Sequence, residues 1–266
     1  MPDTWHHGLM AEWWAMFNTD GPEIDYLGGY VAEGQPALDA GCGTGRLLVP
    51  WLRAGYDVDG CDTSADMIAR CRERAAAEGL DPHLDVTPLH ALAPRRLYRT
   101  IVVCGVFGLG SSRDEDAEAT RRLHDALLPG GMLLIDNELP YADADYWALF
   151  PARARTGLPE PEQDAGERVP APDGSERALQ SRVLSLDPLD QSIVLEIRAD
   201  KWVDGEHVAV EHHQLSMRFY LHQEMLAMLD RAGFEVMDVH GDHRPEPLGP
   251  DSRFAVYHAR RRSDRR

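Results

Sequence analysis

The sequence lacks any long apolar stretch and any pairing of cysteines. No apolar run approaches the ~18 residues that a membrane-spanning helix requires, and we see no secretory signal sequence. The chain has only 4 cysteines, and none of them lies in a CxxC pair or at zinc-like spacing. These absences argue against a membrane span, a disulfide scaffold and a sequence-encoded zinc motif. We therefore expect reduced, packed thiols in a cytoplasmic protein without a membrane partner.

Positive charge is also scarce. Lys and Arg number 27 against 45 Asp and Glu, which gives a formal net charge of -18. A nucleic acid would have to bind against that overall field, so we expect no nucleic-acid partner. A chain of 266 residues is long enough to bury a full core, and it predicts one large domain or a domain with an insertion.

The clearest pattern is the stretch from Pro36 to Leu47, PALDAGCGTGRL. A short apolar run is followed by three spaced glycines and then by an apolar helical pattern, which predicts a strand, a tight turn and a helix N-terminus. Such a turn places free N–H groups against a ligand, and it suits the polar part of a nucleoside-containing molecule. A dinucleotide-binding fingerprint would need glycine where Arg46 stands, and no P-loop Gly-Lys-Ser/Thr is present.

This stretch resembles motif I of the class I S-adenosylmethionine (SAM)-dependent methyltransferases, D-x-G-C-G-x-G. Two further strings carry the same resemblance: DGCDTSADMI at 59–68 is similar to motif II, and LLPGGMLLID at 127–136 is similar to the family's turn into strand five. The C-terminal strand pair also resembles the end of this fold. The sequence departs from the family pattern at 87–89 (TPL), where many relatives carry an acidic residue beside the adenine, and near 99, where Asp is usual.

The resemblance implies SAM as the cofactor, with S-adenosylhomocysteine as the product. Asp62 lies about 20 residues past the glycine loop, at the end of the second predicted strand, where a carboxylate can accept hydrogen bonds from ribose hydroxyls. The alternative is that Asp62 caps the next helix, although Thr63 or Ser64 also suits that position. The cofactor contacts that we expect are Asp39, Gly41, Cys42, Gly43, Gly45, Asp62, Thr63, Met67, Leu89 and Cys104.

Strand and helix patterns alternate from Ala37 to Asp136, which predicts a parallel sheet without reference to any family. Three alternating runs follow at 177–186, 192–203 and 207–220, and they predict an antiparallel insertion. The resemblance completes the expected fold. It is a doubly wound, Rossmann-like α/β sheet of seven strands in the order 3-2-1-4-5-7-6, with strand 7 antiparallel and the insertion between strands 5 and 6.

We expect a single methyltransferase domain over residues 1–266, divided into four parts. These are an N-terminal helical lid (1–35), the SAM-binding core (36–140), a loop and antiparallel β insertion on the substrate side (141–220), and a terminal helix and β-hairpin (221–266). The N-terminal part is rich in Trp and His, and these residues fit either a lid over a pocket or the anchor of a helix on the core. The resemblance favours the lid.

Methyl transfer needs a nucleophile held in line with the sulfonium methyl, and a hydroxyl nucleophile also needs a base. We favour two candidate bases, His213 in the insertion and Glu138 after the fifth strand. The other candidates are His6, His7, Asn137 and His212. His212 and His213 sit on opposite faces of a strand, so only one of them can face a pocket, and either also fits an ordinary sheet histidine. The substrate pocket is expected to include Trp14, Phe107, Asn137 and His212. No metal is expected, because the acidic residues after strands four and five form no obvious set of oxygen ligands.

The sequence therefore predicts an enzyme that transfers a methyl group from SAM to O, N or C of a small molecule, such as a specialised metabolite. Two alternatives stay open. SAM could serve a cyclase-like or regulatory protein that transfers no methyl group, or the domain could bind NAD in an oxidoreductase, which Arg46 disfavours. These motifs do not encode the substrate's identity, and a homodimer is compatible with the sequence.

Overall fold

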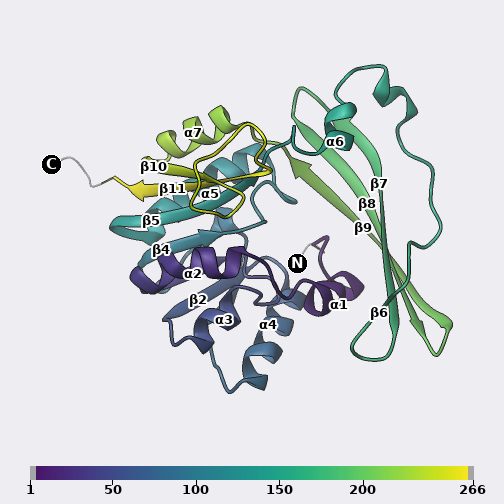
Figure 1. Ribbon diagram of the computed structural model, residues 1–266, viewed down its shortest axis with the longest axis horizontal. Coiled ribbons are helices and arrows are strands. Elements are labelled where there is room, and N and C mark those ends of the chain that lie inside the picture. The colour runs from purple at the N-terminus through teal and green to yellow at the C-terminus, as the bar shows by residue number, and fades with distance from the viewer. Residues whose placement is uncertain (1–3, 263–266) are drawn as a thin grey trace.

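The computed structural model describes residues 4–262 and contains two β-sheets (Figure 1). One sheet is covered by helices, and the other is antiparallel. The first sheet has seven strands in the order β10-β11-β5-β4-β1-β2-β3, and β11 runs antiparallel to both of its neighbours. Its strands are β1 (Ala37–Ala40), β2 (Val58–Asp62), β3 (Leu84–Val86), β4 (Tyr98–Val103), β5 (Leu127–Glu138), β10 (Phe234–Gly241) and β11 (Phe254–Arg261). This topology confirms the predicted strand order.

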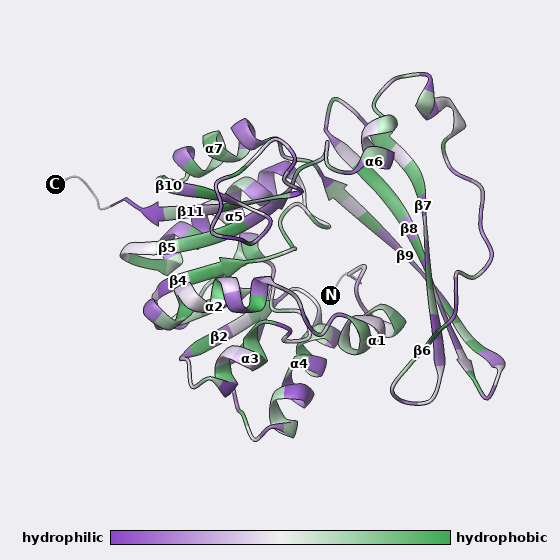
Figure 2. Cartoon of the chain, in the orientation of Figure 1, coloured by the Kyte–Doolittle hydropathy of each residue, from purple (hydrophilic) through white to green (hydrophobic). Residues whose placement is uncertain are grey.

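Helices cover both faces of the seven-stranded sheet. Helices α2 (Glu23–Glu33), α3 (Leu48–Arg53) and α4 (Ala65–Ala77) pack their apolar residues on one face, and α5 (Arg113–Ala126) and α7 (His222–Arg231) pack on the other. Figure 2 shows hydrophobic residues concentrated along the central strands β4 and β5, which lie between these two layers. None of the helices in residues 4–262 is long and apolar enough to cross a membrane.

Local sequence signals define several of these helices. Ser64 caps α4 by accepting a hydrogen bond from the backbone N–H of Met67, which leaves Asp62 free for another role. Ser112 and Glu115 form a capping box at the start of α5. Helix α2 lies within the predicted N-terminal helical part, whereas the short α6 (Ala144–Ala148) lies in the part that was predicted as a loop and β insertion.

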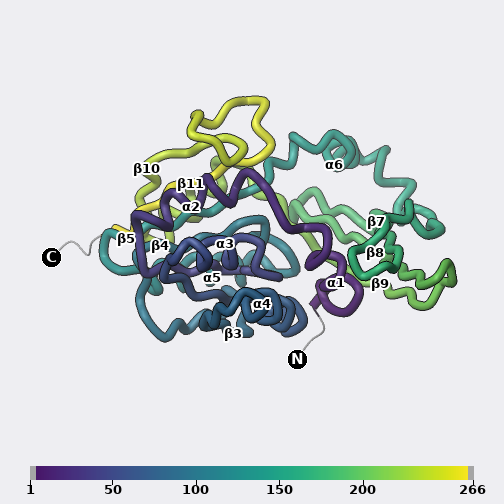
Figure 3. Tube along the Cα trace, turned by 60° about the horizontal axis from the view of Figure 1, so that its bottom comes forward, coloured from purple at the N-terminus to yellow at the C-terminus, as the bar shows by residue number. Residues whose placement is uncertain are grey.

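The second sheet is the predicted antiparallel insertion. Its strands are β6 (Val169–Pro170), β7 (Glu176–Asp187), β8 (Ser192–Val203) and β9 (Glu206–Arg218), in the order β6-β7-β8-β9. Between α6 and β6 the chain is mostly irregular, with one 3-10 turn at Ala154–Gly157. One face of the sheet carries Ile197 and Leu215, and these residues pack on α1 (Gly8–Phe17). Figure 3 shows α1 beside β8 and β9, so the N-terminal segment lies against the insertion.

Candidate functional site

The glycine loop between β1 and α3 combines two packed glycines with one open glycine. A Cβ atom added to Gly41 would lie 2.7 Å from Cγ2 of Val106, and one added to Gly45 would lie 2.8 Å from Sγ of Cys71. Gly43 has a φ of +52°, and no heavy atom lies within 4 Å of its Cβ position. The space beside the Gly43 backbone is therefore open, as a loop that receives a ligand requires.

The Asp62 carboxylate collects three donors at the end of β2. It accepts hydrogen bonds from the backbone N–H of Gly43 at 2.9 Å and of Ser64 at 2.8 Å. The ring of His6 lies in the same place, with Nε2 at 3.1 Å from Oδ1 of Asp62, and the Ser64 hydroxyl donates to the carbonyl oxygen of His6 at 2.7 Å. The N-terminal segment thus lies directly over the predicted ribose position.

Asp39 is the second carboxylate of this region. Burial raises the pKa of Asp39 to about 7, and the positive charge of Arg46 opposes that rise. Its Oδ2 atom is buried without a hydrogen-bond partner among residues 4–262. An orphaned buried acceptor, an exposed glycine backbone and a strand-end carboxylate fit a ligand that carries ribose hydroxyls and a positively charged group.

The other predicted cofactor contacts differ in what they can offer a ligand. Cys42 and Met67 have buried side chains, Thr63 is exposed, and Leu89 is partly buried against the core in a 3-10 turn, Leu89–Ala91. Cys104 directly follows β4 and donates a hydrogen bond from its thiol to Oδ2 of Asp136 at 3.2 Å. Their cofactor roles stay predictions.

A cleft opens at the carboxyl ends of β4 and β5, with an empty volume of about 590 Å³ including space open to solvent. Phe107 and Asn137, two of the predicted pocket residues, line it together with Phe219 from the segment after β9. The Asn137 amide donates to the carbonyl oxygen of Tyr220 at 2.8 Å, which ties β5 to the segment after the insertion. The cleft thus lies between the cofactor side of the first sheet and the second sheet.

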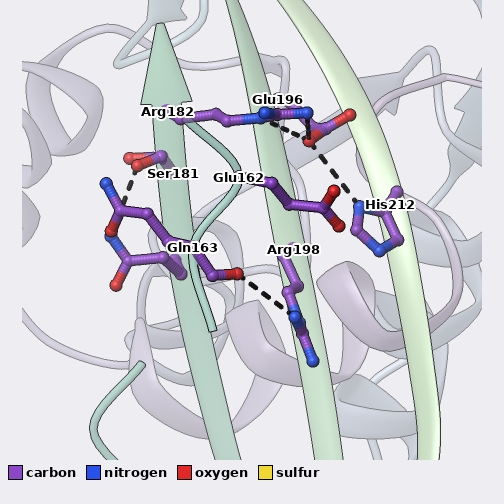
Figure 4. A pocket seen from close by; sticks show the side chains of 8 residues that line it. Glu162, Gln163, Ser181, Arg182, Glu196, Arg198 and His212 are labelled. Carbon is purple, nitrogen blue, oxygen red and sulfur yellow. Dashed lines mark hydrogen bonds and ion pairs between the residues drawn. The ribbon is translucent and has the colours of Figure 1, made fainter. Parts of the chain in front are cut away.

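The two remaining predicted pocket residues, Trp14 and His212, lie outside this lining. Trp14 belongs to α1 and packs with Trp5 and Leu9 against the inner face of the second sheet. His212 lies in a small hollow on the opposite face of the sheet (Figure 4).

That hollow holds a group of paired polar side chains. The Arg182 guanidinium contacts the Glu196 carboxylate at 2.7 Å, and His212 Nδ1 lies 3.8 Å from the same carboxylate. The Arg198 guanidinium donates to the carbonyl oxygen of Gln163 at 3.2 Å (Figure 4). These contacts hold the segment before β6 on the sheet.

The two candidate bases occupy different environments. Glu138 lines the cleft, and its Oε1 atom accepts a hydrogen bond from Nε of Arg253 at 2.8 Å. The His213 side chain is fully buried, 3.2 Å from the Glu211 carboxylate and 4.5 Å from the ring of His7. Burial and the neighbouring His7 lower the pKa of His213. Glu138 is therefore the candidate that the structure places at the cleft.

Sequence reasoning missed Asp136 and His243, and it considered His6 as a base without predicting its contact with Asp62. His6 reaches Asp62 from the N-terminal segment, and His243 reaches Asp136 from the loop between β10 and β11. The first contact joins residues 56 positions apart, and the second joins residues 107 positions apart. No rule based on sequence spacing could have found either contact. The only local signal for Asp136 was its place near the end of the fifth strand.

Comparisons with known proteins agree with this arrangement. Residues 37–131 match a family model described as a methyltransferase domain. Malonyl-[acyl-carrier protein] O-methyltransferase from Pectobacterium atrosepticum is 49% identical over 46 residues, which cover 17% of this chain and 18% of that protein. The chain therefore matches about a fifth of the length of this curated relative.

Two solved structures share the fold over nearly the whole chain. The CcbJ methyltransferase from Streptomyces caelestis superposes with a TM-score of 0.71 at 20% identity, and covers 98% of each chain. The sugar N-methyltransferase KedS8 from Streptoalloteichus sp ATCC 53650 has a TM-score of 0.69 at 19% identity, over 99% of this chain and 96% of that chain.

The strand order and the solved structures show the fold of the class I SAM-dependent methyltransferases, and a methyltransferase domain is matched within it at residues 37–131. The methyltransferase domain matched at residues 37–131 supports an enzyme that takes SAM as its cofactor. The prediction of the fold is confirmed, and the matched domain supports the predicted family and cofactor.

Proposed function

We propose that the enzyme transfers the methyl group of SAM to an amine nitrogen of a small molecule bound in the cleft. The observation that carries this proposal is the position of Val106. Its side chain packs on the Gly41 backbone of the glycine loop, and the same residue lines the cleft. A cofactor on the loop and a substrate in the cleft would therefore meet at Val106, at the carboxyl ends of the strands.

The charges that line the cleft support an amine. Three carboxylates, those of Asp136, Glu138 and Asp143, line it against one guanidinium, that of Arg218. Aromatic side chains supply much of the remaining wall. Excess negative charge attracts a cationic ligand and opposes an anionic one. The similarly folded KedS8 is a sugar N-methyltransferase by name, and that is compatible with a small amine substrate here.

The reaction breaks the bond from the cofactor's sulfonium sulfur to its methyl carbon and forms a bond from that carbon to nitrogen. The sulfonium becomes a thioether, and the amine gives up a proton. The chain's task is to hold the nucleophile about 3 Å from the methyl carbon and in line with the departing sulfur. Glu138 lies at the cleft as the candidate acceptor for the proton.

The experiment compares matched pairs of substrates that differ only in amine and hydroxyl at one position. Purified enzyme is incubated with SAM and each compound, and S-adenosylhomocysteine and the methylated product are measured by mass spectrometry. Product from the amine alone supports the proposal. Product from the hydroxyl alone would move the target atom to oxygen. SAM binding without S-adenosylhomocysteine from any amine would favour a protein that does not transfer methyl.

A further inference from the structure

We propose that Cys104, Asp136 and His243 form a binding site for one zinc-like divalent transition-metal ion. Cys104 follows β4, Asp136 lies in β5, and His243 comes from the loop between β10 and β11. Their potential ligand atoms all lie within 4.8 Å of one another. The site shares Asp136 with the wall of the cleft, and a metal there would replace the predicted cofactor contact of Cys104. None of its three ligands belongs to the glycine loop, and none is the ribose carboxylate, so a metal goes beyond the proposed methyl transfer.

The triangle of ligand atoms has the size that a tetrahedral ion needs. The Cys104 Sγ atom lies 3.2 Å from Oδ2 of Asp136 and 3.9 Å from Nε2 of His243. The third side, from His243 Nε2 to Asp136 Oδ2, measures 3.0 Å. Zinc bonds of about 2.0–2.3 Å at tetrahedral angles place such ligand atoms about 3.3–3.6 Å apart. Shifts of a few tenths of an ångström would therefore complete the coordination.

The donor set also selects the class of ion. One thiolate, one imidazole and one carboxylate suit zinc, whereas calcium and magnesium prefer oxygen ligands. All three side chains are at most 9% exposed. A thiolate and a carboxylate together balance a divalent charge, so the loaded site is neutral, as burial favours.

Neighbouring backbone groups hold the ligands in place. The backbone N–H of Gly105 donates to Oδ1 of Asp136 at 2.7 Å, which directs Oδ2 toward the other two ligands. The loop that carries His243 is fixed by Asp242, whose Oδ1 atom accepts from the backbone N–H of Arg253 at 2.8 Å and of Phe254 at 2.9 Å. His243 itself keeps a positive φ of 53°, a backbone conformation that costs free energy in a residue other than glycine.

Three protein ligands leave one tetrahedral position for an exogenous ligand. Asp136 and Gly105 both line the cleft, so the cleft is the space from which water or a substrate atom can reach that position. The sequence predicted no metal because its acidic residues form no obvious set of oxygen ligands and its cysteines lie at no zinc-like spacing. The fold instead joins one cysteine, one aspartate and one histidine from three separate segments.

The test uses the full chain after treatment with a chelator and dialysis against Zn²⁺ or Co²⁺ alone. Metal content is measured by mass spectrometry, and Co²⁺ is also followed by its thiolate-to-metal charge-transfer absorption. The ligand variants are Cys104→Ala and His243→Ala. The controls are Cys61→Ala, which removes a buried thiol in β2, and His90→Ala, which removes a histidine outside the cluster. Circular dichroism checks that every variant is folded.

The wild type and both controls are expected to retain one ion per chain and to show the charge-transfer band. Cys104→Ala should lose the band, and both ligand variants should lose the stoichiometric ion. A folded wild type that retains no more metal than Cys104→Ala would overturn the proposal, as would a band that survives in Cys104→Ala. The three side chains would then form a hydrogen-bonded cluster in which Asp136 accepts from both partners. None of these readouts depends on methyl transfer.

Discussion

Replacing Asp62 by alanine tests the cofactor assignment most directly. The carboxylate accepts from two backbone N–H groups, those of Gly43 and Ser64, and contacts the ring of His6. Its other proposed partners are the ribose hydroxyls of SAM. A hydrogen bond to a charged group contributes about 1.5–3 kcal/mol. Because about 1.4 kcal/mol corresponds to a tenfold change, we expect the Kd for SAM to rise about 10- to 100-fold in Asp62→Ala.

The same substitution should lower stability without preventing folding. Each buried donor that loses its acceptor costs about 1–3 kcal/mol, and water that enters the vacated space recovers part of that cost. We expect the free energy of unfolding to fall by about 2–4 kcal/mol, against a typical total of about 5–15 kcal/mol for a domain. Urea unfolding measures this change, and isothermal titration calorimetry measures the Kd.

Asp66→Ala is the matched control for Asp62→Ala. Asp66 is exposed in the first turn of α4 and accepts from the backbone N–H of Gly8 at 2.8 Å, so it contacts the N-terminal segment outside the ribose position. We expect its Kd for SAM to stay within about twofold of wild type, as for most surface substitutions. If folded Asp62→Ala binds SAM as tightly as Asp66→Ala, the ribose assignment is wrong.

Gly43→Val should abolish SAM binding in calorimetry, because the valine side chain would occupy the open space over the loop. Gly79→Val is the control: it introduces a similar backbone strain at positive φ, and it should still bind SAM. Glu138→Gln should lower kcat for an amine substrate about 100-fold and leave the Kd for SAM unchanged. The control Glu235→Gln removes the partner of Arg260 and should leave kcat unchanged. Equal kcat values in the two variants would exclude Glu138 as the base. Burial lowers the pKa of His258 from 6.5 to about 4, so only the unfolded chain takes up this proton as pH falls below 6.5. His258 should contribute a fall in stability of about 2 kcal/mol between pH 7 and pH 5, which the raised pKa of Asp39 opposes because the folded chain takes up that proton over the same range. Urea unfolding isolates the contribution of His258 as the difference in pH dependence between wild type and His258→Gln.

The cofactor half of the molecule could be predicted because its signals are local. The strand, the glycine turn and the helix that follow Pro36 are adjacent in sequence, and each has its own composition. Asp62 was predictable for a similar reason, since a strand end and a capping Ser64 two residues later define its place. The strand order followed from family resemblance, because alternation alone predicts a parallel sheet but not the order of its strands.

The substrate half depends on contacts that no local pattern encodes. Alternation along β9 predicts that His212 and His213 face opposite sides of the sheet, and the structure places them so. The sequence did not reveal that the N-terminal segment would cover the face of His213 or that the segment before β6 would cover the face of His212. His243 was equally hidden, because a loop has no periodicity that could indicate the direction of its side chains.

The N-terminal segment joins the two halves. His6 contacts Asp62 on the cofactor side, whereas His7 packs on His213 and the backbone N–H of Leu9 donates to the Glu211 carboxylate at 2.8 Å in the second sheet. Neighbouring residues of this segment thus contact both sheets. A shift of His6 that lets ribose hydroxyls reach Asp62 would have to change the backbone between His6 and Leu9, because His7 and Leu9 are held by their contacts with the second sheet. The N-terminal segment therefore connects the predicted ribose position to β9 through three adjacent contacts.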